Sequence, residues 1–213
     1  MNNRKEEIIT ATLKLASEKG LKAVSMSMIA DEIGIKKPSL YNHFSSKEEI
    51  VREMYVFLRE KSKTFAKEQN TDYAHLFQTK TACEILKIMV QNYILMCSCK
   101  EMEMFYKVIY AERTTSKEAS SILVSETKTM INKTREIFEI FQKNNMLCFE
   151  NIETSAFSFA LAIHAIMDFE ADKSFSETGK IERNLESINN YISVFCDEHK
   201  NKGEQKWKPK NHY

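Results

Sequence analysis

Apolar residues recur every three or four positions along most of the chain, the spacing that gathers them on one face of an α-helix. In residues 3–19, Ile9, Leu13 and Ala16 share such a face, and Gly20 follows as a typical helix end. Glycine and proline number only four and two among 213 residues, so few helices are interrupted. The same spacing predicts further helices over residues 27–33, 38–44, 46–67, 81–97, 100–113, 116–143, 152–171 and 179–200. We therefore expect an all-α protein.

The two shortest predicted helices lie next to each other near the N-terminus. Gly34 ends the first of them, and Pro38 begins the second at the first helical position, where its missing N–H has no intrahelical partner to lose. Leu40 and Phe44 are four residues apart, so they point together toward a core. One long helix followed by two short ones around a glycine-containing turn predicts a helix-turn-helix.

The outward face of the second short helix carries groups suited to nucleic acid. Residues 34–47 contain Lys36, Lys37 and Lys47 and no acidic residue, whereas the whole chain has 31 basic and 30 acidic residues. A lysine at a helix N-terminus opposes the helix dipole at a cost of about 0.3–1 kcal/mol. A bound phosphate would reverse that sign. We interpret the lysines as phosphate or base contacts, although each alone could lie in a solvated turn, and Tyr41 alone could be a packing residue.

Residues 8–51, IITATLKLASEKGLKAVSMSMIADEIGIKKPSLYNHFSSKEEIV, resemble the DNA-binding domain of TetR-type transcriptional repressors, and the run KPSLY is close to the tetracycline-repressor subgroup. The resemblance implies that Tyr41, Lys47 and the hydroxyls of Ser25 and Ser27 bind phosphates. It also implies that the major groove is met by Lys36, Lys37, Pro38, Ser39, Asn42 and His43. The chain departs from many relatives at Ser27, where they have an arginine, and this puts base readout from the first short helix in doubt.

The resemblance also implies that the chain is divided into domains with different functions. We predict a helix-turn-helix domain over residues 1–50 with a linking helix over 46–67, a helical regulatory and dimerisation domain over 51–200, and a disordered basic tail over 201–213. The expected function is a ligand-responsive repressor that binds a near-palindromic DNA operator as a homodimer and is released by a small, largely apolar effector. A transcriptional activator would use the same DNA-binding domain, so the sequence does not distinguish a repressor from an activator. The alternative is a DNA-binding adaptor whose larger domain binds a protein and senses no small molecule.

Two apolar patterns in the second half of the chain favour a dimer. A 4-3-4-3 spacing relates the apolar residues of the last helix, and the helix that precedes it is apolar nearly all round. The predicted interface consists of Phe159, Ile163, Ile166, Ile181, Leu185, Ile188, Ile192 and Phe195. Apolar periodicity cannot separate an interface from a core, so both helices could instead belong to one monomeric core.

Large, soft and amphipathic side chains on the middle helices are candidates for an effector pocket. They are Met89, Tyr93, Met96, Phe105, Tyr106, Tyr110, Phe138, Phe141 and His164. Each of them could instead be an ordinary core residue. His164 and Asp168 are four residues apart and could pair or orient a polar group of the ligand. Cys97 and Cys99 form a C-x-C pattern, a weak indication of a redox or soft-metal sensor.

Other classes of protein find little support. No phosphate-binding glycine loop, H-E-x-x-H or G-x-S-x-G pattern occurs, so we expect no enzyme, no catalytic residue, no cofactor and no metal site. No signal peptide is visible, and the longest uncharged apolar stretch, residues 154–167, is shorter than the ~20 residues of a membrane span. The odd number of five cysteines suits a reducing compartment. We expect a cytoplasmic protein whose partners are DNA, a second copy and a small molecule.

Overall fold

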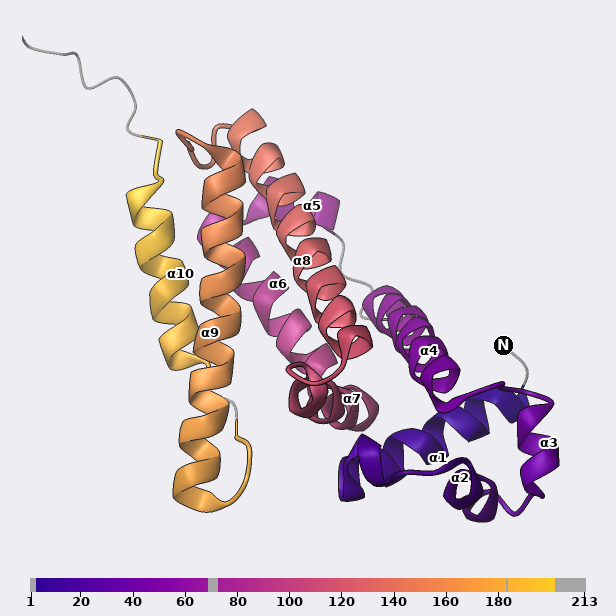
Figure 1. Cartoon of the computed structure of the whole chain (residues 1–213). Helices are drawn as coiled ribbons and strands as arrows, with labels where there is room; N and C mark the ends of the chain where they lie inside the picture. The colour runs from indigo at the N-terminus through magenta and orange to yellow at the C-terminus, as the bar shows by residue number, and fades with distance from the viewer. Residues whose placement is uncertain (1–2, 69–72, 183, 202–213) are drawn as a thin grey trace, which may run out of the picture. The chain divides into compact units, whose positions relative to one another are not determined.

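The computed structural model describes residues 3–68, 73–182 and 184–201, and these ranges contain helices and no strand (Figure 1). The all-α prediction is confirmed. The elements are α1 (Asn3–Lys19), the 3-10 turn η1 (Leu21–Ala23), α2 (Met26–Glu32), α3 (Lys37–Tyr41), α4 (Lys47–Glu68), α5 (Tyr73–Thr79), α6 (Ala82–Cys97), α7 (Lys100–Glu112), α8 (Lys117–Lys143), α9 (Ile152–Thr178) and α10 (Glu186–Glu198). The predicted tail lies outside the described residues from position 202 onward.

The predicted helix ends are wrong chiefly around Gly179. The prediction ended one helix at residue 171 and began the next at 179, whereas α9 continues to Thr178 and α10 begins only at Glu186. Gly179 adopts φ 71°, and its N–H donates to the Phe175 carbonyl oxygen at 2.9 Å. This left-handed residue closes a helix rather than opening one. Sequence periodicity also missed the short elements η1 and α5.

The chain forms two compact units, and the predicted boundary at residue 50 coincides with the limit of neither. The first unit comprises residues 1–72 and 90–128, and the second comprises residues 73–89 and 129–213. The first extends so far because α7 contributes buried Met102, Phe105 and Ile109 to the core that α1 and α4 begin. Apolar burial therefore joins the helix-turn-helix to helices beyond it in the sequence.

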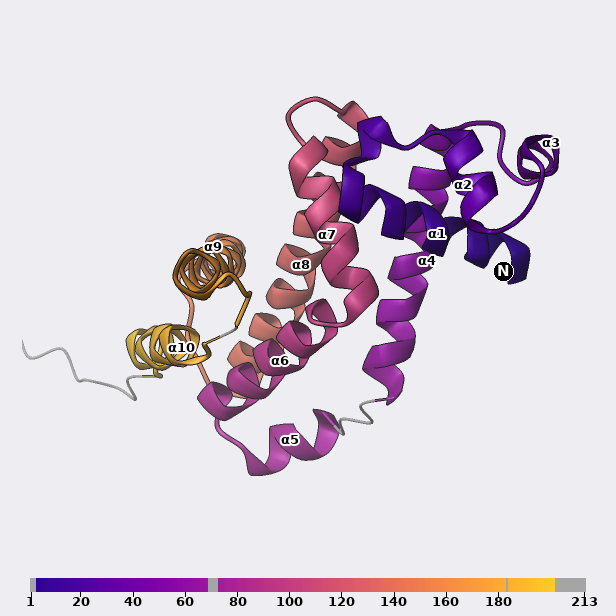
Figure 2. The ribbon, with the colours of Figure 1, turned by 90° about the horizontal axis from the view of Figure 1, so that it is seen from below.

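In the first unit, α1 is the element on which the others pack. It contacts α2, α4 and α7, and α2 in turn contacts α3 (Figure 2). The inward face of α1 holds Ile8, Ile9 and Leu13, all fully buried as the predicted periodicity requires. Leu40 and Phe44 close the same core from the region of α3. The short helices are therefore held by a common apolar core.

An aromatic cluster forms the core of the second unit. The ring of Phe138 on α8 lies 4.5 Å from that of Phe149, 5.5 Å from that of Phe159 on α9 and 5.4 Å from that of Phe195 on α10, measured between centroids. Offset and edge-on aromatic pairs at these separations add to the stabilisation from burial. The cluster fixes α9 beside α10, as Figures 1 and 2 both show.

Most of the predicted dimer interface lies inside this unit. Five of its members are buried by side chains of the same chain, namely Phe159, Ile163, Ile188, Ile192 and Phe195. Ile166 and Leu185 are half-buried. Ile181 is 48% exposed and precedes α10, so the 4-3-4-3 pattern does not run along one helix. For the five buried residues, the alternative of a monomeric core describes the structure better.

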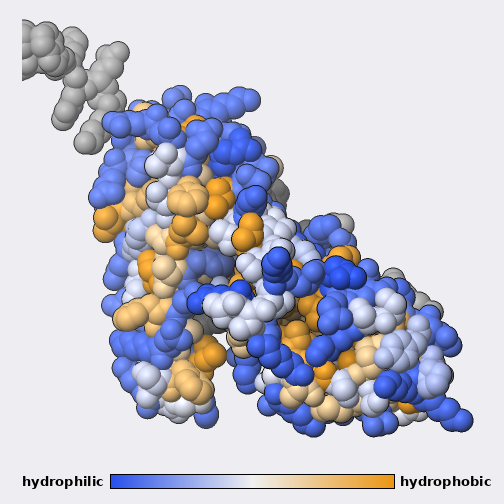
Figure 3. Space-filling view, viewed as in Figure 1, coloured by the Kyte–Doolittle hydropathy of each residue, from blue (hydrophilic) through white to orange (hydrophobic). Residues whose placement is uncertain are grey.

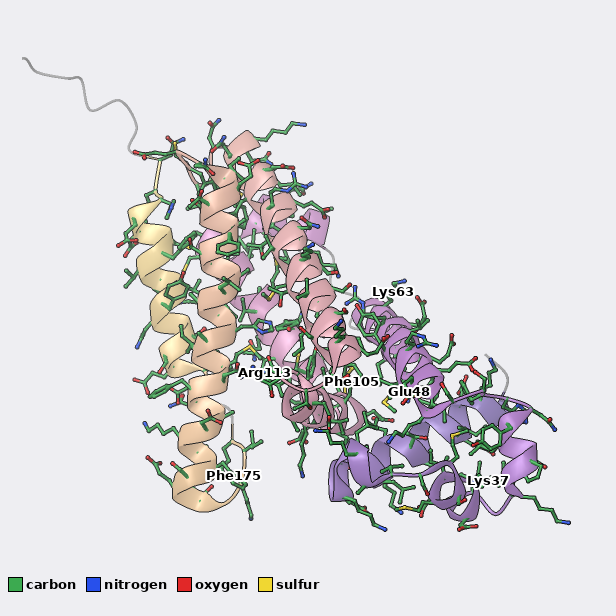
Figure 4. All side chains as sticks on the ribbon, viewed as in Figure 1. Lys37, Glu48, Lys63, Phe105, Arg113 and Phe175 are labelled. Atoms are coloured by element: carbon green, nitrogen blue, oxygen red, sulfur yellow. The ribbon has the colours of Figure 1, made fainter. Side chains whose placement is uncertain are left out.

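The opposite face of α9 is apolar and exposed. Phe157, Leu161 and Phe169 follow one another at multiples of four residues and are 51%, 37% and 63% exposed. Phe175, marked near the end of α9 in Figure 4, is exposed as well. Figure 3 shows the apolar colour gathered along α9 on the face in view. A row of large exposed apolar side chains of this kind marks an interaction surface.

The helix α9 is longer than the apolar stretch from which we argued against a membrane span. That expectation used the uncharged stretch of residues 154–167, whereas the whole helix has 27 residues and, by length and composition, could cross a membrane. Together α6 and α7 pass the same test as a bent pair. Core helices of soluble proteins meet this criterion too, so it is weak evidence of a span.

Candidate nucleic-acid interface

The first motif helix, α2, has a defined cap at each end. Ser25 is its N-cap and accepts the Met28 N–H at 3.2 Å. Gly34 adopts φ 68° after the helix, and the Ile35 N–H donates to the Ala30 carbonyl oxygen at 2.9 Å. This is a Schellman ending, and it requires the left-handed conformation that glycine adopts without strain. The turn between α2 and α3 is thus set by Gly34.

The second motif helix, α3, is short and anchored from one side. It begins at Lys37, so Pro38 is its second residue rather than its first, and it ends at Tyr41 rather than at residue 44. The backbone still turns beyond that point, because the Phe44 N–H donates to the Leu40 carbonyl oxygen at 3.1 Å. Leu40 and Phe44 are both buried, and this confirms their predicted anchoring role.

The outward face of α3 presents most of the predicted DNA-binding side chains to solvent. The exposed members are Lys36, Lys37, Pro38, Ser39, Tyr41 and Asn42, and His43 is half-buried. The Lys37 ammonium lies 6.0 Å from the centroid of the Tyr41 ring, close enough for a weak cation–π interaction. Neither Lys36 nor Lys37 forms an ion pair within the described part of the chain. Figure 4 marks Lys37 on α3.

Lys47 differs from the prediction because its charge already has acceptors inside the protein. Its ammonium donates to the Leu21 carbonyl oxygen at 2.8 Å and to the Val24 carbonyl oxygen at 3.0 Å. These carbonyls belong to η1 and its C-terminal flank, where a cation is favoured. Lys47 therefore ties the start of α4 to the turn before α2. Only one of its three N–H groups is left for a phosphate.

Two serines and a glutamate cap the start of α4. Ser46 accepts the Glu49 N–H at 3.1 Å, as a capping serine does. The Glu49 carboxylate reaches back to the residue before this serine, and it accepts from the hydroxyl and the N–H of Ser45, both at 2.6 Å. These hydrogen bonds lower the pKa of Glu49, the hydroxyl contributing most. The chain after α3 is thus fixed by side-chain caps.

The predicted effector residues are divided between the two units. Tyr93, Met96, Phe105, Tyr106 and Tyr110 belong to the first, and Met89, Phe138, Phe141 and His164 belong to the second. Phe105, Phe138 and Phe141 are fully buried among other rings, as core residues are. His164 is half-buried and Asp168 is exposed on α9.

A polar cluster inside the first unit gathers around Glu126 of α8. Tyr55 donates to Oε1 of Glu126 at 3.1 Å, Arg59 pairs with the same oxygen at 3.1 Å, and Tyr106 donates to Oε2 at 3.2 Å. Burial raises the pKa of Tyr106 and Tyr93 well above that of ordinary tyrosine, so both hydroxyls stay protonated. The cluster joins α4, α7 and α8 through one carboxylate.

Tyr106 is one of the predicted effector residues, whereas Glu126 is not among them. A signal was present, because Glu126 follows buried Ala119 and Ile122 at the spacing of one helix face. A carboxylate on an apolar face needs partners inside the protein. The C-x-C pair gives no comparable site: Cys97 is buried at the end of α6, and the Cys99 thiol donates to the Met96 carbonyl oxygen at 2.6 Å.

Comparison with known proteins assigns a family to the N-terminal segment. Residues 8–54 match the family described as bacterial regulatory proteins, tetR family. Over 54 residues the chain is 43% identical to the HTH-type transcriptional repressor KstR2 of Mycobacterium tuberculosis, a match that covers 25% of this chain and 27% of that protein. Over 51 residues it is 43% identical to the uncharacterized HTH-type transcriptional regulator YerO of Bacillus subtilis, covering 24% and 18%. The chain thus spans about a quarter of the length of these curated relatives.

Solved structures share the fold over nearly the whole chain. The fatty acid degradation regulator FadR from Bacillus halodurans superposes with a TM-score of 0.64 at 15% identity, over 92% of this chain and 95% of that one. GusR of Salmonella enterica gives 0.64 at 17% identity, over 91% and 93%. A Saccharomonospora viridis protein solved in complex with choline gives 0.63 at 18% identity, over 92% and 97%. At these identities the likeness shows the fold, an N-terminal helix-turn-helix followed by a larger helical part.

Proposed function

We propose that the chain as a whole is a transcriptional repressor that responds to a small ligand, since its residues 8–54 match the tetR family of bacterial regulatory proteins. The observation that carries the proposal is the outward face of α3. Lys36 and Lys37 lie there exposed and without an ion pair in the described residues, while Leu40 and Phe44 hold the helix from behind. Unpaired cations on a rigidly held helix suit a DNA backbone. As a repressor the protein would act in the cytoplasm and would need no catalytic activity.

The roles of the DNA-facing side chains follow from their chemistry and reach. Hydroxyl groups of Tyr41, Ser25 and Ser27 would donate to phosphate oxygens, the acceptors that such side chains commonly contact on DNA. The third N–H of Lys47 would add a phosphate contact. Base edges in the major groove would meet Lys36, Lys37, Pro38, Ser39, Asn42 and His43, among which the amide and the ammonium groups can discriminate bases.

A homodimer would place two such helices on one duplex. Two copies related by a two-fold axis reach successive major grooves roughly 34 Å apart and read a near-palindromic operator. We place the interface on the outer face of α9, because Phe157, Leu161 and Phe169 are exposed there. The exposed Val194 of α10 would extend it. This surface replaces the buried residues that the sequence pattern had suggested.

The effector site of the proposal lies at the Glu126 cluster. Tyrosine rings and a half-buried carboxylate suit a small molecule with an apolar body and one polar or cationic group. The choline complex of the Saccharomonospora viridis neighbour is consistent with such a ligand. Because Tyr55 and Arg59 belong to α4, a ligand that competes for Glu126 would act on the helix that follows the DNA-binding motif. The shift of a two-state equilibrium would then release DNA.

Selection from a pool of randomised duplexes tests DNA recognition directly. The wild-type protein should enrich an inverted repeat, and Lys37→Met should bind the selected duplex more weakly and with an altered preference among its single-base variants. Fluorescence anisotropy with the selected duplex and its single-base variants measures both. Lys107→Met, which changes an exposed lysine on α7, is the matched control and should bind as the wild type does. A pool that shows no enrichment after selection contradicts the proposal.

A thermal-shift screen separates the repressor from the adaptor. Small amphiphilic amines and acids, choline included, should contain compounds that raise the midpoint of unfolding, since a ligand that binds only the folded state stabilises it. Glu126→Gln keeps the side-chain shape and removes the charge, so the same compounds should lose their effect on that variant. If no compound shifts the wild-type midpoint, the adaptor becomes the better description.

A further inference from the structure

Two cysteines far apart in the sequence meet in the second unit. Cys83 lies in the first turn of α6 and Cys196 lies near the end of α10. The Cys83 and Cys196 side chains interact, and the proximity of the Cys83 thiol raises the pKa of Cys196. The Cys83 sulfur also lies 3.9 Å from the hydroxyl oxygen of Ser193, one helical turn before Cys196. Two independent contacts therefore place the Cys83 side chain against the same stretch of α10.

The two thiols differ in their access to solvent. Cys83 is partly exposed, whereas Cys196 is buried. Burial, together with the neighbouring Cys83 thiol, raises the pKa of Cys196 to about 12, so Cys196 stays protonated at neutral pH. An oxidant from solvent therefore reaches Cys83 first, because Cys196 is buried.

We propose that Cys83 and Cys196 form a redox-sensitive site that takes a hydroperoxide as oxidant and closes into a disulfide between α6 and α10. In the first step the Cys83 sulfur attacks a peroxide oxygen, the O–O bond breaks, water leaves, and Cys83 becomes a sulfenic acid. In the second step the Cys196 sulfur attacks the Cys83 sulfur, the S–O bond breaks, and the leaving hydroxide takes the Cys196 proton. With hydrogen peroxide, two thiols and one oxidant give one disulfide and two waters.

The other cysteines offer no equivalent pair. Cys97 is buried at the end of α6, and the Cys99 thiol is engaged by the Met96 carbonyl oxygen, with burial raising its pKa. Cys148 is exposed and serves as an internal control for unselective oxidation. The site acts within the second unit and does not depend on the proposed DNA binding. Its consequence would be a covalent link between the start of α6 and the end of α10.

Tryptic digestion of the full chain separates the possible outcomes. Cleavage after lysine and arginine puts Cys83 in residues 81–87, Cys196 in 184–200, Cys148 in 144–173, and both Cys97 and Cys99 in 88–100. The reduced protein is treated with hydrogen peroxide, its remaining thiols are alkylated, and the peptides are identified by mass spectrometry. We expect peptides 81–87 and 184–200 to be joined, with the loss of two hydrogen atoms, and to separate after dithiothreitol.

Single cysteine substitutions test whether the disulfide joins Cys83 to Cys196. Cys83→Ala and Cys196→Ala should each abolish the joined peptide, whereas Cys148→Ala should leave it unchanged. Circular dichroism of the reduced variants checks that each has the helical fold. The proposal is overturned if wild-type Cys83 is oxidised to the sulfinic acid while Cys196 is still alkylated, or if peptide 81–87 is joined to 144–173 instead. It is also overturned if both thiols remain fully alkylated at peroxide levels that oxidise Cys148.

Discussion

Replacing Phe138 with alanine is expected to lower the free energy of unfolding by about 3–5 kcal/mol. Phe138 is fully buried, and its ring contacts those of Phe149, Phe159 and Phe195, which come from three separate segments. Alanine would remove the shared centre of this cluster and leave a cavity that three helices cannot close without moving. Urea denaturation monitored by circular dichroism measures the loss.

Ile140→Ala is the matched control for this experiment. Ile140 lies on the same helix two residues further along and is exposed, so its truncation should cost well under half as much. Equal losses for the two variants would show that Phe138 does not hold the second unit together. From its sequence, Phe138 could be an effector-pocket residue or an ordinary core residue. A large loss of unfolding free energy for Phe138→Ala alone would establish that it is a core residue.

Replacing Leu161 with glutamate is expected to convert a dimer into a monomer, with a dissociation constant at least about 100-fold higher. Leu161 lies between Phe157 and Phe169 on the exposed face of α9, so a partner covering this face would bury the new carboxylate without a counter-charge. The isolated chain should tolerate the change because the side chain can remain in solvent. Sedimentation velocity over a range of concentrations measures the shift.

Val56→Glu controls for the introduction of a charge as such. Val56 is also an exposed apolar residue, but it lies on α4. This variant should sediment as the wild type does. A Leu161→Glu protein that remains dimeric would move the interface away from α9, and a wild type that is monomeric at all concentrations would remove the dimer from the proposed function.

The sequence was sufficient to predict most of the helices, because their apolar faces repeat regularly. It was misleading where an apolar pattern ran through a break: Ile181 and Leu185 continue the spacing of α10, yet α10 begins only after them. Apolar periodicity also predicts that a residue is buried, but it does not tell whether the same chain or a partner chain buries it. Phe159 and Ile192 therefore fitted a dimer seam as well as they fit the core in which they are found.

The exposed face of α3 was predictable for a local reason. The outward positions of α3 follow from the inward positions of Leu40 and Phe44 within the same few residues. The role of Lys47 was not predictable, because its acceptors are carbonyls of Leu21 and Val24, brought near only by folding. Likewise, the Cys83–Cys196 pair joins residues on two helices that no spacing rule connects.

In and just after α3, the residues that pack into the core are different from those that face outward. Leu40 and Phe44 carry the packing, while Lys37, Ser39 and Asn42 point away from it. Substitutions at these three outward positions should therefore change the preferred DNA sequence at little cost in stability. A descendant of this chain could acquire a new set of target genes through a few surface changes, with its folding left intact.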